Sequence, residues 1–137
     1  MTEEQRKVRE FHLRAGLGAP ERPAWIGQER HRVLVALIEG ELAEFRNAGD
    51  TVSLTEVADA LGDLLYTVYG AAVEYGIDLE PVFAEIHGSQ LSKCEPRAVR
   101  RPDGTVMKGE SYRPPRLKEI IEAQVSNHLD RREAAPV

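Results

Sequence analysis

Apolar residues along this chain recur every three or four positions, which is the spacing of amphipathic helices and not the alternation of strands. The first predicted helix runs from Thr2 to Ala15 and stops at Gly16. After the connector GAPERP, a second helix is predicted from about Gln28 to Ala48. Residues 47–50 (NAGD) are typical of turns, so we expect the second helix to end among them.

The next two helices are bounded by recognisable end signals. Ser53 with Glu56 has the spacing of a capping box, so a third helix is predicted from Ser53 to about Tyr75. Gly76 is placed to end that helix, and Asp78 is placed to cap a fourth. The apolar positions of the fourth helix are Leu79, Val82, Phe83, Ile86 and Leu91.

The segment from Cys94 to Pro115 has a different character, because it is rich in proline and basic residues. Asp103-Gly104 predicts a turn, and a short hairpin is possible between Val99 and Val106. A last amphipathic helix follows, and the tail at Arg131–Val137 is expected to be frayed. The apolar stripe of the last helix is Leu117, Ile120, Ile121, Gln124 and Val125. The pattern predicts one all-α domain of four or five helices covering residues 1–137.

Five carboxylates stand inside two apolar helical stretches, which read VLVALIEGELAEF and EVADALGDLLYTVYG. They are Glu41, Glu44, Glu56, Asp59 and Asp63. In each helix the acids fall within an arc of about 60°, which also carries or borders apolar residues. A carboxylate that faces a core is costly unless it is paired or binds a metal, and neither stretch contains Lys or Arg. The sequence therefore predicts a divalent-cation site at these acids.

The ligand chemistry favours Mg²⁺ or Mn²⁺ over iron or zinc, because the predicted donors are all oxygen. A di-iron carboxylate bundle needs Glu-x-x-His on two helices, and the chain has no such spacing. The alternative is that some of the acids are exposed or cap neighbouring groups. Glu39 points nearly opposite to Glu41, so we interpret Glu39 as a surface residue.

Basic residues gather after the fourth predicted helix, and they could counter a substrate that carries several negative charges. They are Lys93, Arg97, Arg100, Arg101 and Lys108. The alternative is a solvated basic loop. Tyr66 and Tyr69 lie near the acids and could stack on a base, or could be core residues. Cys94 has no activating arrangement around it, so we expect it to be a bystander.

Bulk properties exclude several classes of protein. The net charge of −5 argues against binding to a nucleic-acid backbone. A single cysteine indicates a reducing compartment. No signal peptide and no apolar run long enough to span a membrane is visible, so we expect a cytoplasmic protein.

Four motifs together resemble the MazG-like superfamily of all-α nucleoside triphosphate pyrophosphohydrolases, over roughly Val8 to Leu117. They read IEGELAEF, EVADALGDLLYTVYGAAVEYGID, IHGSQLSK and RRPDGTVMKGESYRPP. The last is similar to a branch labelled as phosphoribosyl-ATP pyrophosphohydrolase-like. The resemblance implies Mg²⁺-dependent cleavage between the α- and β-phosphates, which gives a monophosphate and pyrophosphate.

The resemblance also implies roles for individual residues. Glu41 and Glu44 match an ExxE motif, and Glu56 and Asp59 match ExxD. Aligning on Asp-Leu-Leu-Tyr makes Asp63 the motif aspartate instead. Glu44 is our first candidate for the general base. The implied substrate-binding residues are Ser89, Gln90, Lys93, Lys108 and Tyr112, with Tyr66 and Tyr69 beside the base or sugar. Relatives often carry a second Glu where this chain has Gly40 and Asn where it has Gln90, which bears on the number of bound ions and on the contact made by Gln90.

The predicted function is hydrolysis of a (d)NTP, with dUTP or a non-canonical nucleotide as the substrate. The alternatives are phosphoribosyl-ATP hydrolysis in histidine synthesis and a non-catalytic helical dimerisation module. Apolar residues surround most of the second and third helices, from Leu34 to Ile38 and from Leu61 to Val68. One small bundle cannot cover them all, so we predict a homodimer or a dimer of dimers.

Overall fold

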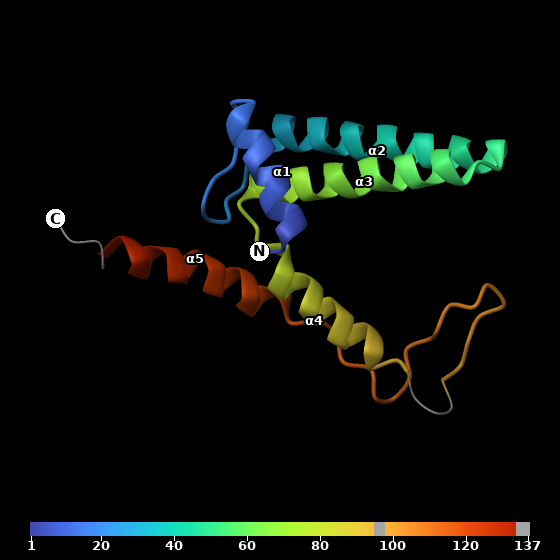
Figure 1. Cartoon of the computed structure of the whole chain (residues 1–137). Coiled ribbons are helices and arrows are strands. Elements are labelled where there is room, and N and C mark those ends of the chain that lie inside the picture. Colours follow the sequence, from blue (N-terminus) through green and yellow to red (C-terminus); the bar gives the residue numbers. More distant parts are fainter. Residues whose placement is uncertain (95–97, 134–137) are drawn as a thin grey trace. The chain divides into compact units, whose positions relative to one another are not determined.

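The computed structural model describes residues 1–94 and 98–133, with the side chains of residues 127–133 not described. Over these residues the chain forms five helices (Figure 1), which confirms the all-α fold class. They are α1 (Glu3–Arg14), α2 (Gln28–Thr51), α3 (Leu54–Tyr75), α4 (Leu79–Leu91) and α5 (Leu117–Glu133). The chain divides into two compact units, Met1–Leu79 and Glu80–Val137. The prediction of one domain stays a prediction.

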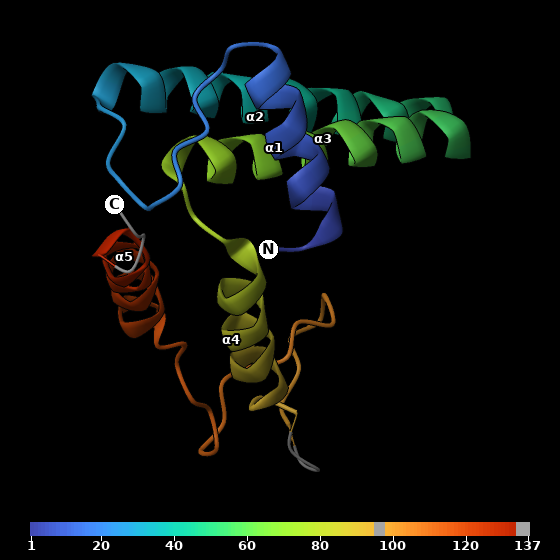
Figure 2. The same ribbon diagram turned by 60° about the vertical axis from the view of Figure 1, so that its left-hand side comes forward.

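In the first unit, α2 and α3 lie side by side, and α1 crosses α3 (Figures 1 and 2). Helix α1 begins as predicted, because the Thr2 hydroxyl accepts the backbone N–H of Gln5 at 3.2 Å. Gln5 is fully buried, and both polar atoms of its side-chain amide form hydrogen bonds. It donates to the Ile77 carbonyl at 2.7 Å and accepts the backbone N–H of Leu79 at 3.0 Å. One side chain thus ties α1 to residues 77–79, at the end of the first unit.

Helix α2 is longer than predicted. It continues through residues 47–50 to Thr51, and the chain turns at Val52, whose φ of 53° is left-handed. The expected end near Ala48 is wrong, because Ala48 is buried and the turn propensity of its neighbours is weaker than packing between helices. Ser53 then caps α3 by accepting the backbone N–H of Glu56 at 3.3 Å, so the predicted cap is confirmed.

An ion pair joins the first turn of α2 to the last turn of α3, and the sequence pattern did not predict it. Arg30 donates through Nε and Nη2 to the two carboxylate oxygens of Glu74, at 2.6 and 2.5 Å. Glu74 is buried at 7% exposure, so this bidentate pair satisfies a carboxylate that would otherwise be costly to bury. One residue along each helix, the Tyr75 hydroxyl lies 2.8 Å from Nδ1 of His31.

Gly76 ends α3 in the left-handed conformation, as predicted, with φ of 69°. Its backbone N–H reaches the carbonyls of Ala72 and Val73. A side chain at this position would collide with the backbone of Arg22, which lies in the connector between α1 and α2. Glycine is therefore needed here both for its φ and for its small size.

In the second unit, a carboxylate on α4 holds the segment that leads into α5. Glu85 accepts from the Arg113 guanidinium at 2.7 Å and from the backbone N–H of Arg116 at 3.0 Å. The N–H of Arg116, followed by the Arg113 side chain, lowers the pKa of Glu85 below its ordinary value. The backbone N–H of Arg113 also donates to the Ser92 hydroxyl at 2.8 Å.

The predicted turn at Asp103-Gly104 is confirmed. Arg100 and Val106 form an isolated antiparallel bridge, and Gly104 has a left-handed φ of 86°.

The last helix is also confirmed, with its predicted apolar stripe half-buried. It runs through residues 131–133, whereas residues 134–137 and Arg97 lie outside the described residues, so the expected fraying of the tail stays a prediction. None of the helices in the described part of the chain is long and apolar enough to cross a membrane.

Candidate functional site

Three of the predicted carboxylates converge between α2 and α3. One oxygen from each of Glu41, Glu44 and Asp63 lies within 4.8 Å of the other two. Glu41 and Glu44 are one helical turn apart on α2, and Asp63 comes from the neighbouring helix. Three carboxylate oxygens at this separation are suitable ligands for one hard divalent cation.

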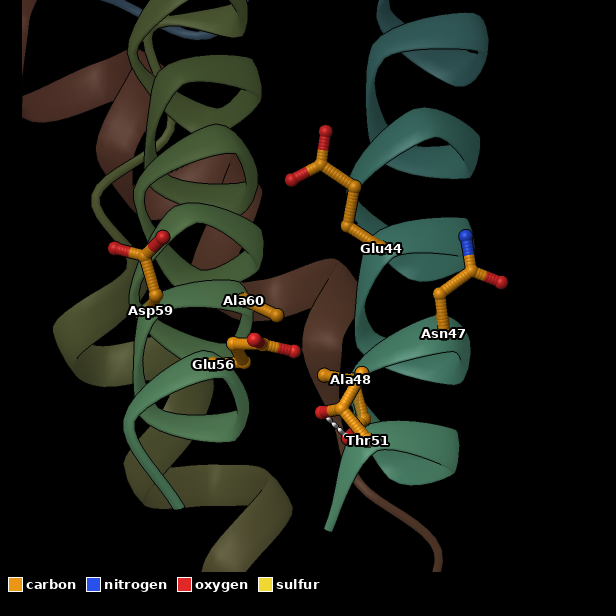
Figure 3. Close-up of a pocket in the computed structure, with 7 residues that line it drawn as sticks. All are labelled: Glu44, Asn47, Ala48, Thr51, Glu56, Asp59 and Ala60. Atoms are coloured by element: carbon orange, nitrogen blue, oxygen red, sulfur yellow. Dashed lines mark hydrogen bonds between the residues drawn. The ribbon is translucent and has the colours of Figure 1, made fainter. Parts of the chain in front are cut away.

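A pocket of about 230 Å³ adjoins Glu44. In Figure 3, the carboxylates of Glu44 and Glu56 point toward the space between the two helices, whereas that of Asp59 points away from it. The residues that line the pocket are Glu44, Asn47, Ala48, Thr51, Glu56, Asp59 and Ala60. Glu44 therefore belongs both to the three-carboxylate group and to the pocket.

The five predicted ligands thus separate into two sets that share Glu44. Asp63, and not Asp59, lies at ligand distance from Glu41 and Glu44, which favours Asp63 as the aspartate of the metal group. Glu56 and Asp59 border the pocket instead.

The electrostatics of the group favour a bound cation. Partial burial raises the pKa of Glu41 above its ordinary value, and the charges of Glu44 and Asp63 raise it further. Within the described residues, no Lys, Arg or His forms an ion pair with any of the five predicted ligands. A divalent cation would remove this repulsion, so the donor set fits the predicted Mg²⁺ or Mn²⁺.

The predicted burial of the carboxylates is wrong for the single chain. The carboxylates were expected to face a core, yet Glu41 is half-buried and the other four are exposed. The apolar neighbours are exposed as well, with Leu37 at 48% and Phe45 at 36%. The acids lie on two helices as predicted, but a pair of helices leaves the acid-bearing face of each one at the surface.

The two tyrosines predicted near the nucleotide lie on α3, close to Asp63 in sequence. Tyr66 is exposed and makes an edge-to-face contact with Phe11, with ring centroids 6.0 Å apart. Tyr69 is half-buried. The accessible ring of Tyr66 is therefore the better placed of the two for stacking on a ligand.

The predicted phosphate-binding residues lie in the second unit and mostly contact one another. The Lys93 ammonium donates to the side-chain oxygen of Gln90 at 2.6 Å. The ammonium groups of Lys93 and Lys108 lie 5.7 and 4.7 Å from the centroid of the Tyr112 ring. Ser89 is buried at 2% exposure.

Asn47 and Thr51 were not predicted as pocket residues, because Asn47 was assigned to a turn and Thr51 lies beyond the predicted end of the second helix. A signal was present, since Asn47 is three residues and Thr51 seven residues after Glu44, the spacing of one helical face. The Thr51 hydroxyl donates to the Ala48 carbonyl at 2.9 Å, which satisfies a carbonyl in the last turn of α2.

Comparison with protein-family models matches residues 8–90 to the model described as phosphoribosyl-ATP pyrophosphohydrolase. The match runs from α1 into α4, so it contains all five predicted ligands and the pocket. Comparison with curated proteins finds no match.

Proposed function

The chain belongs to the phosphoribosyl-ATP pyrophosphohydrolase family of MazG-like all-α hydrolases, and on this premise we propose that it cleaves nucleoside triphosphates in a Mg²⁺-dependent reaction. The family implies a pyrophosphohydrolase that acts on nucleotides. The products of the proposed reaction are a (d)NMP and pyrophosphate. The proposed substrate is dUTP or a non-canonical nucleotide.

The observation that carries this proposal is the convergence of Glu41, Glu44 and Asp63 next to a pocket. These three residues would hold the cation, which when bound would neutralise charge on the phosphates. Glu44 lies at the border of the group and the pocket, which suits a general base. It would accept a proton from the water that attacks phosphorus, while the bond between the α- and β-phosphates breaks and pyrophosphate leaves.

Ser89, Gln90, Lys93, Lys108 and Tyr112 remain our proposed phosphate contacts, and Tyr66 and Tyr69 our proposed contacts to the base or sugar. The contact pattern within the second unit supports Lys93 and Lys108 in this role, because both ammonium groups lack a carboxylate partner among the described residues. We also propose that the protein works in the cytoplasm as a homodimer or dimer of dimers, without nucleic-acid or membrane partners.

Phosphoribosyl-ATP is a second candidate substrate, because the matched family model is described by that activity. Its hydrolysis would break the same type of bond and release the same leaving group. The carboxylate group would serve both substrates, so it does not discriminate between them.

Pyrophosphate release tests the proposal. The protein is incubated with dUTP, the common (d)NTPs, oxidised nucleotides and phosphoribosyl-ATP, with Mg²⁺ or Mn²⁺ and with EDTA as the control. We expect release from at least one substrate with a divalent cation and none with EDTA. Activity only on phosphoribosyl-ATP would select the second candidate. Release from none of them would favour the non-catalytic dimerisation module.

Metal binding is tested separately by calorimetry with Mg²⁺ and Mn²⁺ in the absence of nucleotide. We expect binding that is abolished in Glu41→Gln/Glu44→Gln, because two of the three converging ligands lose their charge. Unchanged binding in the double variant would place the cation elsewhere.

A further inference from the structure

Three aromatic rings gather where the connector between α1 and α2 meets the end of α3. The centroid of the Trp25 ring lies 5.5 Å from that of His31 and 5.9 Å from that of Tyr75. The rings of His31 and Tyr75 are 6.4 Å apart and are also linked by the 2.8 Å contact between Nδ1 and the hydroxyl oxygen. These three residues form one cluster within the first unit, the Trp25 cluster.

Trp25 is the most accessible ring of the Trp25 cluster. It is 65% exposed, whereas His31 and Tyr75 are half-buried. A tryptophan is highly buried in most folded proteins, so an indole with this exposure is unusual. Its ring is large and apolar, and it presents a flat face to which another planar ring can bind.

The backbone on both sides of Trp25 restricts where the indole can lie. Directly before it, the backbone N–H of Ala24 donates to the carbonyl of Tyr75 at 3.0 Å. Shortly after it, Gly27 has a left-handed φ of 89° and α2 begins at Gln28. The ring is therefore oriented before a ligand arrives, and little conformational entropy is lost on binding.

The residues next to the Trp25 cluster in the sequence favour a small planar ligand over an apolar protein surface. They are exposed and polar, with two acids and two arginines: Glu21, Arg22, Gln28, Glu29 and Arg32. Mixed charges of this kind give no strong preference for an anion or a cation. An aromatic face beside such residues suits an uncharged heteroaromatic ring with hydrogen-bonding groups at its edge, and a nucleobase has this chemistry.

The position of the Trp25 cluster along α2 fits a nucleotide that also reaches the carboxylate group. His31 precedes Glu41 by ten residues on this helix, which is about 15 Å along the axis and about 80° around it. An extended nucleoside triphosphate spans a comparable length. One nucleotide would therefore place its base at the Trp25 cluster and its phosphates at the cation.

We propose that Trp25 stacks on the nucleobase of the bound nucleotide. This inference deepens the proposed function, on which it rests for its biological ligand. Tyr66 and Tyr69 would then border the sugar. Every base has a π-face, so the indole supplies affinity for a base and does not choose between bases.

The test uses the fact that Trp25 is the only tryptophan in the chain. Its indole N–H gives one side-chain cross-peak in a ¹H–¹⁵N spectrum of the full chain. Adenosine, uridine and ribose are titrated in EDTA, so that neither phosphate nor a cation contributes. We expect both nucleosides to shift this cross-peak and ribose to leave it in place, with little effect of salt because no ion pair is involved. No shift with either nucleoside, or an equal shift with ribose, would overturn the proposal.

Variants separate stacking on Trp25 from binding elsewhere, with the affinity for adenosine followed by backbone amide shifts. Trp25→Leu should weaken binding about tenfold, whereas Trp25→Phe keeps an aromatic face and should lose less. Phe83→Leu is the matched control, because Phe83 is an exposed aromatic residue of the second unit, and it should bind like the wild type. Unchanged binding in Trp25→Leu, or an equal loss in Phe83→Leu, would refute the site. A loss in Tyr66→Leu with none in Trp25→Leu would place the base at Tyr66.

Light scattering distinguishes a nucleobase from a second copy of the chain as the occupant. Trp25→Leu should have the same mass as the wild type, and a shift toward the single chain would make Trp25 part of an interface and overturn the proposal. The outcome is also separable from catalysis. A protein whose indole cross-peak responds to nucleosides but that hydrolyses no nucleotide would sink the proposed function and leave this site in place, whereas hydrolysis without the response would do the reverse.

Discussion

At the scale of single residues, Glu44 has the most distinctive position. Among the described residues it is the one carboxylate that belongs both to the three-carboxylate group and to the pocket. Asp63 and Glu41 complete the group, while Glu56 faces the pocket. A change at Glu44 is therefore expected to affect cation binding and proton transfer together.

We expect Glu44→Gln to lower kcat/KM for the active nucleotide more than about 100-fold, because even outer partners of metal ligands cost about 10–100-fold. Glu39→Gln is the matched control, since Glu39 is an exposed glutamate on the same helix and outside both sets. It should retain nearly full activity. Pyrophosphate release under steady-state conditions measures both variants, and a comparable loss in Glu39→Gln would argue against the assigned site.

The sequence predicted which acids share a helical face but could not choose between Asp59 and Asp63. Helical periodicity fixes the angular position of each acid around its own axis. It does not fix how far α3 slides along α2, and that offset brings Asp63 level with Glu41 and Glu44. The Arg30–Glu74 pair was missed for the same reason, because its partners are 44 residues apart.

At the scale of elements, local signals predicted helix ends wherever one residue makes the decisive contact. Thr2, Ser53 and Gly76 each end or begin a helix through their own side chain or conformation. The end of α2 was predicted wrongly because residues 47–50 have only weak preferences, and contact with α3 decides their conformation.

Gly76→Ala should lower the free energy of unfolding by about 1–3 kcal/mol or more, because it forces a left-handed residue and a clash with the backbone of Arg22. Gly62→Ala, in the middle of the same helix and with open space around it, should instead stabilise by about 0.5–1 kcal/mol. Urea denaturation of both variants checks the opposite signs. Equal effects would contradict the described end of α3.

Glu85→Gln should loosen the segment that leads into α5. The pKa of Glu85 is lowered in the folded state, so its contribution to stability is complete above the ordinary value of 4.5 and is lost as pH falls through the lower folded value. The variant should therefore melt below the wild type at pH 7, and the difference should shrink in acid.

Amide exchange gives a local measure of the same change, because the N–H of Arg116 donates to Glu85. Its protection should fall in Glu85→Gln. Glu122→Gln is the control, since Glu122 is exposed and lies 3.8 Å from Lys118 in a surface pair that contributes little. A pH-independent difference in melting temperature between Glu85→Gln and the wild type would contradict the assigned pKa shift.

At the scale of the whole molecule, the single chain leaves much apolar surface uncovered. The exposed apolar residues of α2 and α3 include Val33, Val35, Leu37, Leu42, Phe45, Leu61, Leu65, Tyr66 and Val68. Many exposed apolar side chains on two neighbouring helices favour an interface with another chain. A second copy of the chain is the occupant that we propose.

Light scattering at micromolar concentration should give at least twice the chain mass of 15.3 kDa. Leu65→Lys should shift the equilibrium toward the single chain, because it places a charge on the apolar surface. Thr55→Lys adds the same charge on α3 without removing apolar area and should not. A wild-type mass of one chain would refute the predicted assembly.

All five candidate ligands lie on α2 and α3, which are joined only by Val52 and Ser53. An insertion or deletion elsewhere in the chain leaves the spacing of these acids unchanged, whereas one residue inserted in α3 before Asp63 would turn its carboxylate by about 100°. Helices α2 and α3 therefore carry all the ligands of the proposed cation site as one unit. Recombination could move this pair of helices between proteins without changing the spacing of the five acids.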